Sequence, residues 1–226
     1  LYCRSRNHTG SCRKRLADFT ASGESHPALK TSVLYHPHSL LTRGKKQCII
    51  ASVRRTEVIG TRARESTCCF TGHRPDKLPW GLDENSAECR KLRIEIAIQL
   101  EALHSAGIAH FISGMALGCD LLFAEAVLAM REEYDDVTLE AAVPCDSQAN
   151  SWPEEQKERY NAILSSCDTV TFVQHQYTPG CMLRRNRYMV DSSSVLLACF
   201  NGSSGGTMNT LLYARRHGVK TIIIDI

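Results

Sequence analysis

The stretch that decides the fold is IAHFISGMALGCDLLFAEAVLAMREEYDDVTLEAAVP, residues 108–144. The apolar run at 108–113 predicts a strand, and a turn containing glycine leads from it into a helix rich in Leu and Ala. This helix is expected to run from Gly118 to about Tyr134, and the next strand from 137 to 143, where Pro144 ends it. Two strands joined through a helix are expected to be parallel, because parallel neighbours need a long crossover connection.

The same alternation continues on both sides of this stretch. Strands are expected at 67–71, 108–113, 137–143, 169–173, 195–200 and 219–226, and helices beginning near 85, 118, 151, 182 and 206. The near-continuous apolar character of 221–224 predicts a strand buried on both faces. We therefore expect a doubly wound, Rossmann-like α/β domain, with a parallel sheet and helices on both of its faces.

Local patterns place the ends of two helices. Asn85 is the expected N-cap of the first, with Glu88 three residues later, and Gly107 is expected to stop that helix. Ser151 and Glu154 have the same capping-box spacing before the third helix. The apolar stripe of the first helix follows helical spacing. It consists of Cys89, Leu92, Ile96, Leu100 and Leu103.

The composition is that of an ordinary globular protein, since 43% of the 226 residues are hydrophobic and 23% are charged. Collagen-like, fully disordered and coiled-coil classes are therefore excluded. No apolar stretch approaches the roughly 18 residues that a membrane helix needs. We expect the protein to be cytoplasmic and to have no membrane partner. We also expect the natural chain to begin at a residue other than Leu1.

Charge divides the chain near residue 66. Residues 1–66 carry 13 Lys and Arg and 4 Asp and Glu, a net +9, whereas residues 67–226 carry 14 and 20, a net −6. The basic part lacks a sustained apolar period, with at most one short strand at 48–53. We interpret 1–66 as a disordered or artefactual N-terminal extension, such as an upstream extension of the reading frame, and 67–226 as the folded domain. A basic arm that binds nucleic acid is the alternative.

The 11 cysteines are scattered and never form a Cys-x-x-Cys pair. A zinc site would show paired ligands, and a secreted disulfide scaffold would be shorter and denser. We expect reduced, mostly buried thiols and no metal site. The sequence identifies no cofactor.

The candidate site is a set of small, polar loops at the carboxyl ends of the strands, where open α/β sheets bind their ligands. Glycine turns let backbone N–H groups approach an anion, and a helix N-terminus behind them adds a favourable dipole. The best phosphate cradle is Gly205-Gly206-Thr207, which opens the last helix. The candidate ligand-binding residues are Gly72, His73, Arg74, Ser113, Gly114, Gly118, Asp120, Arg185, Ser204, Gly205, Gly206 and Thr207.

Several of these residues have an alternative structural interpretation. Asp120 is either an N-cap or an acceptor for a ribose hydroxyl, and the arginines at 184, 185 and 187 are either a solvated face or recognise anions. Cys145 is interpreted as inert, since no His is near it in sequence. P-loop, Gly-x-Gly-x-x-Gly and serine-nucleophile motifs are absent from the sequence, and we predict no catalytic residue.

Four segments together resemble the YpsA-like branch of the SLOG superfamily over about residues 67–226. They are Cys69–Pro75, Ser113–Asp120, Arg185–Met189 and Ser204–Thr207, with the glycines and arginines at the positions given above. The resemblance implies a Rossmann-like domain that binds nucleotides or nucleotide-derived ligands, of the ADP-ribose or NAD-derivative type, as a sensor or regulatory module. No reaction is established for this branch, and the oligomeric state stays open, with a homo-oligomer as one option.

Two related families imply alternative functions. In the LOG phosphoribohydrolases, an Arg matching Arg185 and a loop Glu act on an N-glycosidic bond, but the Glu position here is Thr210. The protein is thus expected not to be an enzyme, with a nucleoside monophosphate hydrolase as the alternative. The DprA family binds single-stranded DNA, and the net −6 of residues 67–226 makes this the weaker alternative for the present chain.

Overall fold

The computed structural model describes residues 64–226, which begin with a short 3-10 helix at Arg64–Ser66. The expected extension and the expected strand at 48–53 lie outside the described residues, apart from 64–66. What the sequence predicts for that region stays a prediction.

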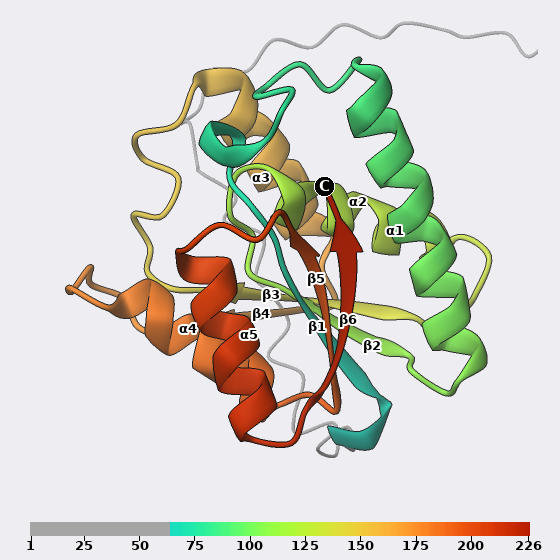
Figure 1. Ribbon diagram of the computed structural model, residues 1–226. Helices are drawn as coiled ribbons and strands as arrows, with labels where there is room; N and C mark the ends of the chain where they lie inside the picture. The colour runs from blue at the N-terminus through green and yellow to red at the C-terminus, as the bar shows by residue number, and fades with distance from the viewer. Residues whose placement is uncertain (1–63) are drawn as a thin grey trace, which may run out of the picture. The chain divides into compact units, whose positions relative to one another are not determined.

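Residues 64–226 form a six-stranded parallel sheet with the order β4-β3-β2-β1-β5-β6. Its strands are β1 (Thr67–Thr71), β2 (His110–Ser113), β3 (Thr138–Val143), β4 (Thr169–Phe172), β5 (Val195–Phe200) and β6 (Lys220–Asp225). From β1, the strands β2, β3 and β4 follow one another toward one edge of the sheet. The chain then returns and adds β5 and β6 on the other side of β1 (Figure 1). In the β1–β5 pair, Phe70 of β1 lies opposite Leu197 of β5.

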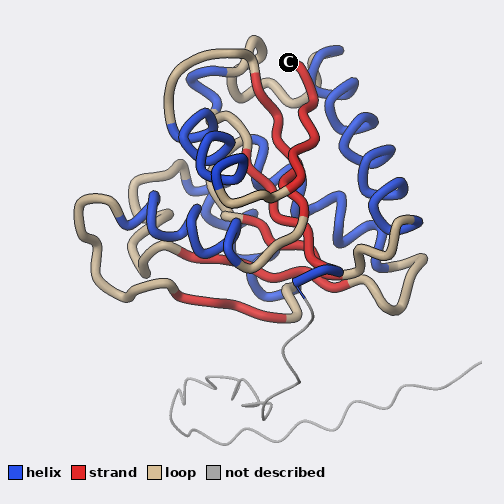
Figure 2. Tube along the Cα trace, turned by 60° about the horizontal axis from the view of Figure 1, so that its bottom comes forward, coloured by secondary structure: helices blue, strands red, loops and turns tan. Residues whose placement is uncertain are grey.

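Helices cover both faces of this sheet. They are α1 (Ala87–Ser105), α2 (Cys119–Arg131), α3 (Glu154–Ser166), α4 (Cys181–Asp191) and α5 (Gly206–Arg216). The first three pack on one face and the last two on the other, so that the strands lie between two sets of helices (Figure 2). The expected doubly wound, Rossmann-like α/β fold is confirmed.

Side chains that alternate along β1 connect the sheet to both layers, because successive residues of a strand point to opposite faces. Phe70 stacks on Phe123 of α2 with ring centroids 4.4 Å apart, in the larger hydrophobic core. Cys69 faces the other way, into the core beneath α4 and α5. The predicted apolar stripe of α1 is buried along its whole length.

Three local predictions are wrong. The N-cap of α1 is Ser86, whose hydroxyl accepts a hydrogen bond from the Cys89 N–H, and not Asn85. The capping box at 151–154 does not form, because Pro153 is the N-cap of α3 and has no side-chain cap. β6 is not buried on both faces, since it lies at the edge of the sheet and leaves Ile223 37% exposed.

Within residues 64–226, no helix combines the length and the hydropathy needed to cross a lipid bilayer. The cysteines of this region are free thiols, and all of them except Cys167 are buried. The same part of the chain has no group of three or more His, Cys, Asp or Glu side chains arranged to hold a metal ion.

Candidate functional site

The site forms where the chain changes direction. β1 and β5 are neighbours, yet the chain leaves β1 toward α1 on one face and leaves β5 toward α5 on the other. Ligands of open α/β sheets bind at such a switch point, outside the carboxyl ends of the strands. The loops that follow β1 and β5 meet there, and the Thr207 hydroxyl donates to the Gly72 carbonyl at 3.0 Å.

These loops enclose a cavity of about 160 Å³. Of the candidate residues, it is lined by Gly72, His73, Arg74, Asp120, Arg185, Gly206 and Thr207. Thr71, Asp76, Lys77, Ala116, Met182 and Asn186 complete the wall. The glycine turns at Gly72 and Gly206 therefore share one cavity, and their contact with a ligand stays a prediction.

The remaining candidates lie behind or beside the wall. The buried Ser113 hydroxyl donates to the Asp120 carbonyl at 2.9 Å and accepts from the Met115 N–H. Gly118 is the N-cap of α2, with a φ of +100° that favours glycine. Ser204 and Gly205 precede α5, in the loop that carries its first N–H groups to the cavity. Ser113 and Gly118 thus build the loop and do not line the cavity.

A buried ion pair forms the floor of the cavity. Asp120 and Arg185 come from α2 and α4, are 5% and 4% exposed, and lie 3.9 Å apart between carboxylate oxygen and Nη1. The Arg185 guanidinium also donates to the Gly114 carbonyl and, through Nε at 2.7 Å, to the Asn186 side chain. Asp120 is not the N-cap of α2, because Gly118 holds that position, and its carboxylate accepts from the Ala116 N–H at 3.3 Å.

Burial sets the ionisation of this pair. It raises the pKa of the Asp120 carboxyl above its ordinary value, while the positive charge of Arg185 opposes that rise. Burial likewise lowers the pKa of Arg185, against the effect of Asp120. Since an arginine keeps its proton in proteins, and since both side chains are largely buried, each charge depends on the other for compensation.

His73 joins the two loops as a neutral side chain. Its Nε2 accepts from the backbone N–H of Asn201 at 3.3 Å, which places the ring proton on Nδ1. The ring is 3% exposed and stacks on Phe200 at 5.6 Å between centroids. Burial lowers the pKa of His73 below its ordinary 6.5, and the charge of Lys77 lowers it further.

This arrangement predicts that acid weakens the fold at the site. Because the folded-state pKa is below the unfolded value of 6.5, the unfolded chain binds more protons, and the His73 contribution falls as the pH drops through about 6.5. In His73→Gln, an amide oxygen replaces the acceptor and does not titrate. Urea unfolding at pH 7.5 and at pH 5.5 measures how much free energy of unfolding each protein loses in acid. The wild type should lose more than His73→Gln, by up to about 1.4 kcal/mol per unit of pKa shift. Equal losses would refute the assignment.

Lys77 and Asn186 line the cavity but were not predicted from the sequence. Lys77 follows the Gly-His-Arg-Pro turn within a short 3-10 helix, Pro75–Lys77, and its nearness to Arg74 in sequence is the pattern that could have identified it. Asn186 lies inside the Arg-Asn-Arg run, where its charged neighbours dominate the pattern. Its amide donates to the Thr210 hydroxyl at 2.8 Å.

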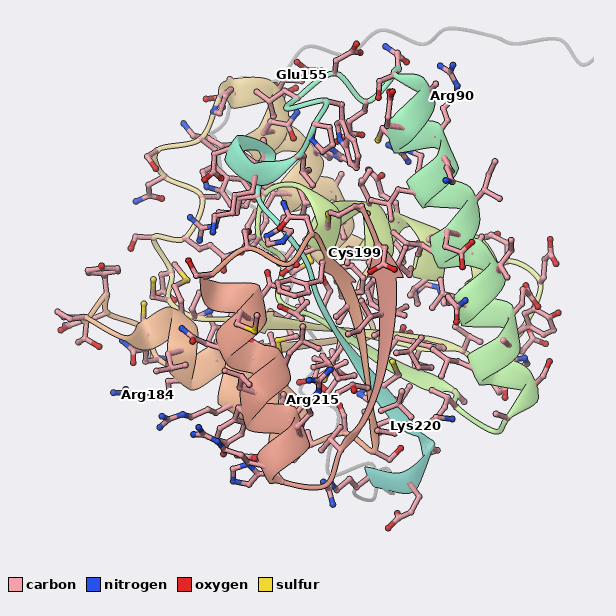
Figure 3. The ribbon with its side chains drawn as sticks, in the orientation of Figure 1. Arg90, Glu155, Arg184, Cys199, Arg215 and Lys220 are labelled. Carbon is pink, nitrogen blue, oxygen red and sulfur yellow. The ribbon has the colours of Figure 1, made fainter. Side chains whose placement is uncertain are left out.

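Other positions discussed from the sequence lie away from the cavity. Thr210 is buried and donates its hydroxyl to the Gly206 carbonyl at 2.8 Å, so it supports the first turn of α5. Arg184 and Arg187 are exposed, and Arg184 points outward from α4 (Figure 3). Cys145 is buried, with its sulfur 3.6 Å from the Ser147 hydroxyl.

Comparison with known proteins gives a family match over most of the described residues. The YpsA family model, described as the YspA SLOG family, matches residues 68–220. The uncharacterized SPbeta prophage-derived protein YoqJ of Bacillus subtilis (strain 168) is 30% identical over 118 residues, 47% of this chain and 69% of that protein. The UPF0398 protein YpsA of the same strain is 26% identical over 145 residues, 63% of this chain and 80% of that protein.

One solved structure with a similar arrangement is DNA processing protein A from Helicobacter pylori, which was studied for its single-stranded DNA binding mode. The identity is 18% and the TM-score 0.48, over 71% of this chain and 65% of that chain.

Proposed function

The chain belongs to the YspA SLOG family, and from that premise we propose that its switch-point cavity binds a nucleotide or nucleotide-derived ligand by the phosphate end and that the protein is a ligand sensor. The observation that carries this proposal is the bond from the Thr207 hydroxyl to the Gly72 carbonyl, which joins two loops 135 residues apart at one cavity. The first N–H groups of α5 and the Arg74 and Lys77 side chains reach the same space.

An anion is the ligand chemistry that this end of the cavity favours. The N-terminus of α5 carries a partial positive charge and has no side-chain cap. Arg74 and Lys77 add two positive charges, and neither forms an ion pair with any of residues 64–226. A phosphate group would accept hydrogen bonds from all three features.

A carboxylate in the same cavity favours a hydroxyl. Asp120 lies in the cavity floor, and a carboxylate accepts hydrogen bonds and repels anions. A ligand that carries both a phosphate and sugar hydroxyls offers a partner to the cations and to this carboxylate. ADP-ribose, related NAD derivatives and nucleoside monophosphates share this chemistry.

The cavity offers little to N-glycoside hydrolysis. That reaction needs a carboxylate that stabilises an oxocarbenium-like centre or moves a proton. Thr210 occupies the corresponding position, and Asp120 is already paired with Arg185. A nucleoside monophosphate hydrolase is therefore the second candidate, tested by release of free base.

Single-stranded nucleic acid is the third candidate ligand. Arg184 and Arg187 of α4 and Arg215 of α5 are exposed and would offer positive charge to phosphates outside the cavity. Arg184 and Arg215 are labelled in Figure 3. Binding of that kind weakens steeply as salt is added, whereas a ligand enclosed in the cavity depends on salt far less. The slope of affinity against salt concentration separates the two.

A thermal-shift titration of the full chain with ADP-ribose, NAD, AMP and adenosine tests the proposal. A ligand at 100 times its Kd stabilises the folded state by about 2.7 kcal/mol, which raises the unfolding temperature by several degrees. The Arg74→Gln variant should reduce the affinity for the phosphorylated ligands about tenfold or more. Arg90→Gln, on α1 outside the cavity wall, is the matched control. No shift with any of the four compounds at 10 mM would refute the proposal.

A further inference from the structure

Lys77 is fastened to the loop that precedes α5 at two points. Its ammonium donates to the Ser204 carbonyl at 2.5 Å, and its own carbonyl accepts from the Asn201 side-chain amide at 3.1 Å. A lysine side chain ordinarily moves among many rotamers and loses considerable entropy when it is held. Here the protein itself keeps the side chain in place at the rim of the cavity.

Gly205 makes room for this ammonium. A Cβ built on Gly205 would lie 2.7 Å from Lys77 Nζ, and the φ of +147° is one that a side chain rarely adopts. The N-cap of α5 is therefore a residue without a side chain, and the ammonium lies against the backbone at that point. As a result, a full positive charge is held beside the positive end of a helix.

That placement brings several positive charges to one cavity. The ammonium, the α5 N-terminus and Arg74 are all positive. Asp76 lines the same cavity, but no carboxylate of residues 64–226 forms an ion pair with Lys77. The charge of Lys77 also acts on its neighbour, since it helps to lower the pKa of His73. Only one of the three ammonium donors has a protein acceptor.

We propose that Lys77 is the specificity-determining residue of the cavity, a preset ammonium that selects ligands carrying a dianionic phosphate ester over their unphosphorylated counterparts. This inference rests on the proposed function. The Ser204 carbonyl holds one N–H and leaves the other two for phosphate oxygens. Because the side chain is ordered before the ligand arrives, binding requires little further ordering.

The test compares AMP with adenosine, two probes that differ only in the phosphate. Dissociation constants are measured by calorimetry on the full chain for wild type, Lys77→Met, Lys77→Arg and Lys91→Met. Lys77→Met removes the charge but keeps most of the side-chain volume. It should weaken AMP binding about 10- to 100-fold, as expected for a lost charge-assisted hydrogen bond, and leave adenosine binding unchanged.

The controls separate a binding role from a structural one. Lys77→Arg should restore part of the preference for AMP, and Lys91→Met, on α1 outside this cavity, should preserve it fully. Because the Lys77–Ser204 contact is exposed, unfolding temperatures of the variants should agree with wild type within a few degrees. A preference for AMP that survives in Lys77→Met, or equal weakening of both probes, would overturn the inference while leaving the proposed function intact. If wild type binds neither AMP nor any other phosphorylated compound of the panel, both fail.

Discussion

Replacing Arg185 with Ala is expected to lower the free energy of unfolding by about 3–5 kcal/mol, the loss typical of removing one partner from a buried ion pair. Asp120 would be left 5% exposed and without its cation, and the Gly114 carbonyl would lose its donor. Urea denaturation at pH 7 with circular dichroism detection measures this loss. A change below about 1 kcal/mol would mean that the pair is hydrated in solution.

The double variant Asp120→Asn, Arg185→Ala is the control, because it removes both charges and should recover much of the loss. The pH dependence gives an independent check. Burial already raises the pKa of Asp120, and without Arg185 that rise is larger. A raised folded-state pKa stabilises the fold below the unfolded value and loses that contribution as the pH rises. The deficit of Arg185→Ala should therefore shrink when the pH is lowered from 7 toward 4.5, and a constant deficit would contradict the assignment.

The fold was predictable because its main determinants are local. The stripe from Cys89 to Leu103 repeats with helical spacing, and that spacing alone selects the buried face of α1. Asn85 and Ser86 are both good N-caps, so the sequence could not choose between them; the path of the backbone into α1 favours Ser86. The exposure of Ile223 depends on strand order, which the apolar run in β6 does not encode.

The cavity was predictable in position but not in detail. Loops rich in glycine after parallel strands indicate the edge of the sheet at which the cavity lies, since topology brings those ends together. Arg185 appeared in the sequence as a residue for charge recognition, yet its Nε and Nη1 groups contact the protein groups Asn186, Gly114 and Asp120. Whether Arg185 faces a ligand or a carbonyl depends on tertiary contacts between α4 and the loop at 113–118. A local sequence pattern does not predict such contacts.

The distribution of charge in the cavity agrees better with binding than with catalysis. The buried carboxylate of Asp120 is neutralised by Arg185, and both are held by hydrogen bonds to the backbone or to Asn186. Arg74 and Lys77 also line the cavity and form no ion pair with any of residues 64–226. The proposed binding role therefore rests on a compensated ion pair and on two cations that the protein leaves without an ion-pair partner among residues 64–226.

Gly114→Ala is expected to disrupt the same ion pair from the backbone side. A Cβ at this position would lie 2.6 Å from Arg185 Cζ and 2.7 Å from an Asp120 carboxylate oxygen, so both side chains would have to shift. Overpacking of this kind lowers the free energy of unfolding by about 1–3 kcal/mol and should also weaken AMP binding, because the cavity floor shifts. Gly206→Ala is the matched control for stability, since nothing lies within 4 Å of its added Cβ, and its free energy of unfolding should stay within about 0.5 kcal/mol of wild type. Urea denaturation could instead find the two variants equally stable. That result would mean that the 113–118 loop adapts more easily than its contacts with Arg185 imply. The cavity floor would then not be the rigid element on which the proposed recognition of a ligand depends.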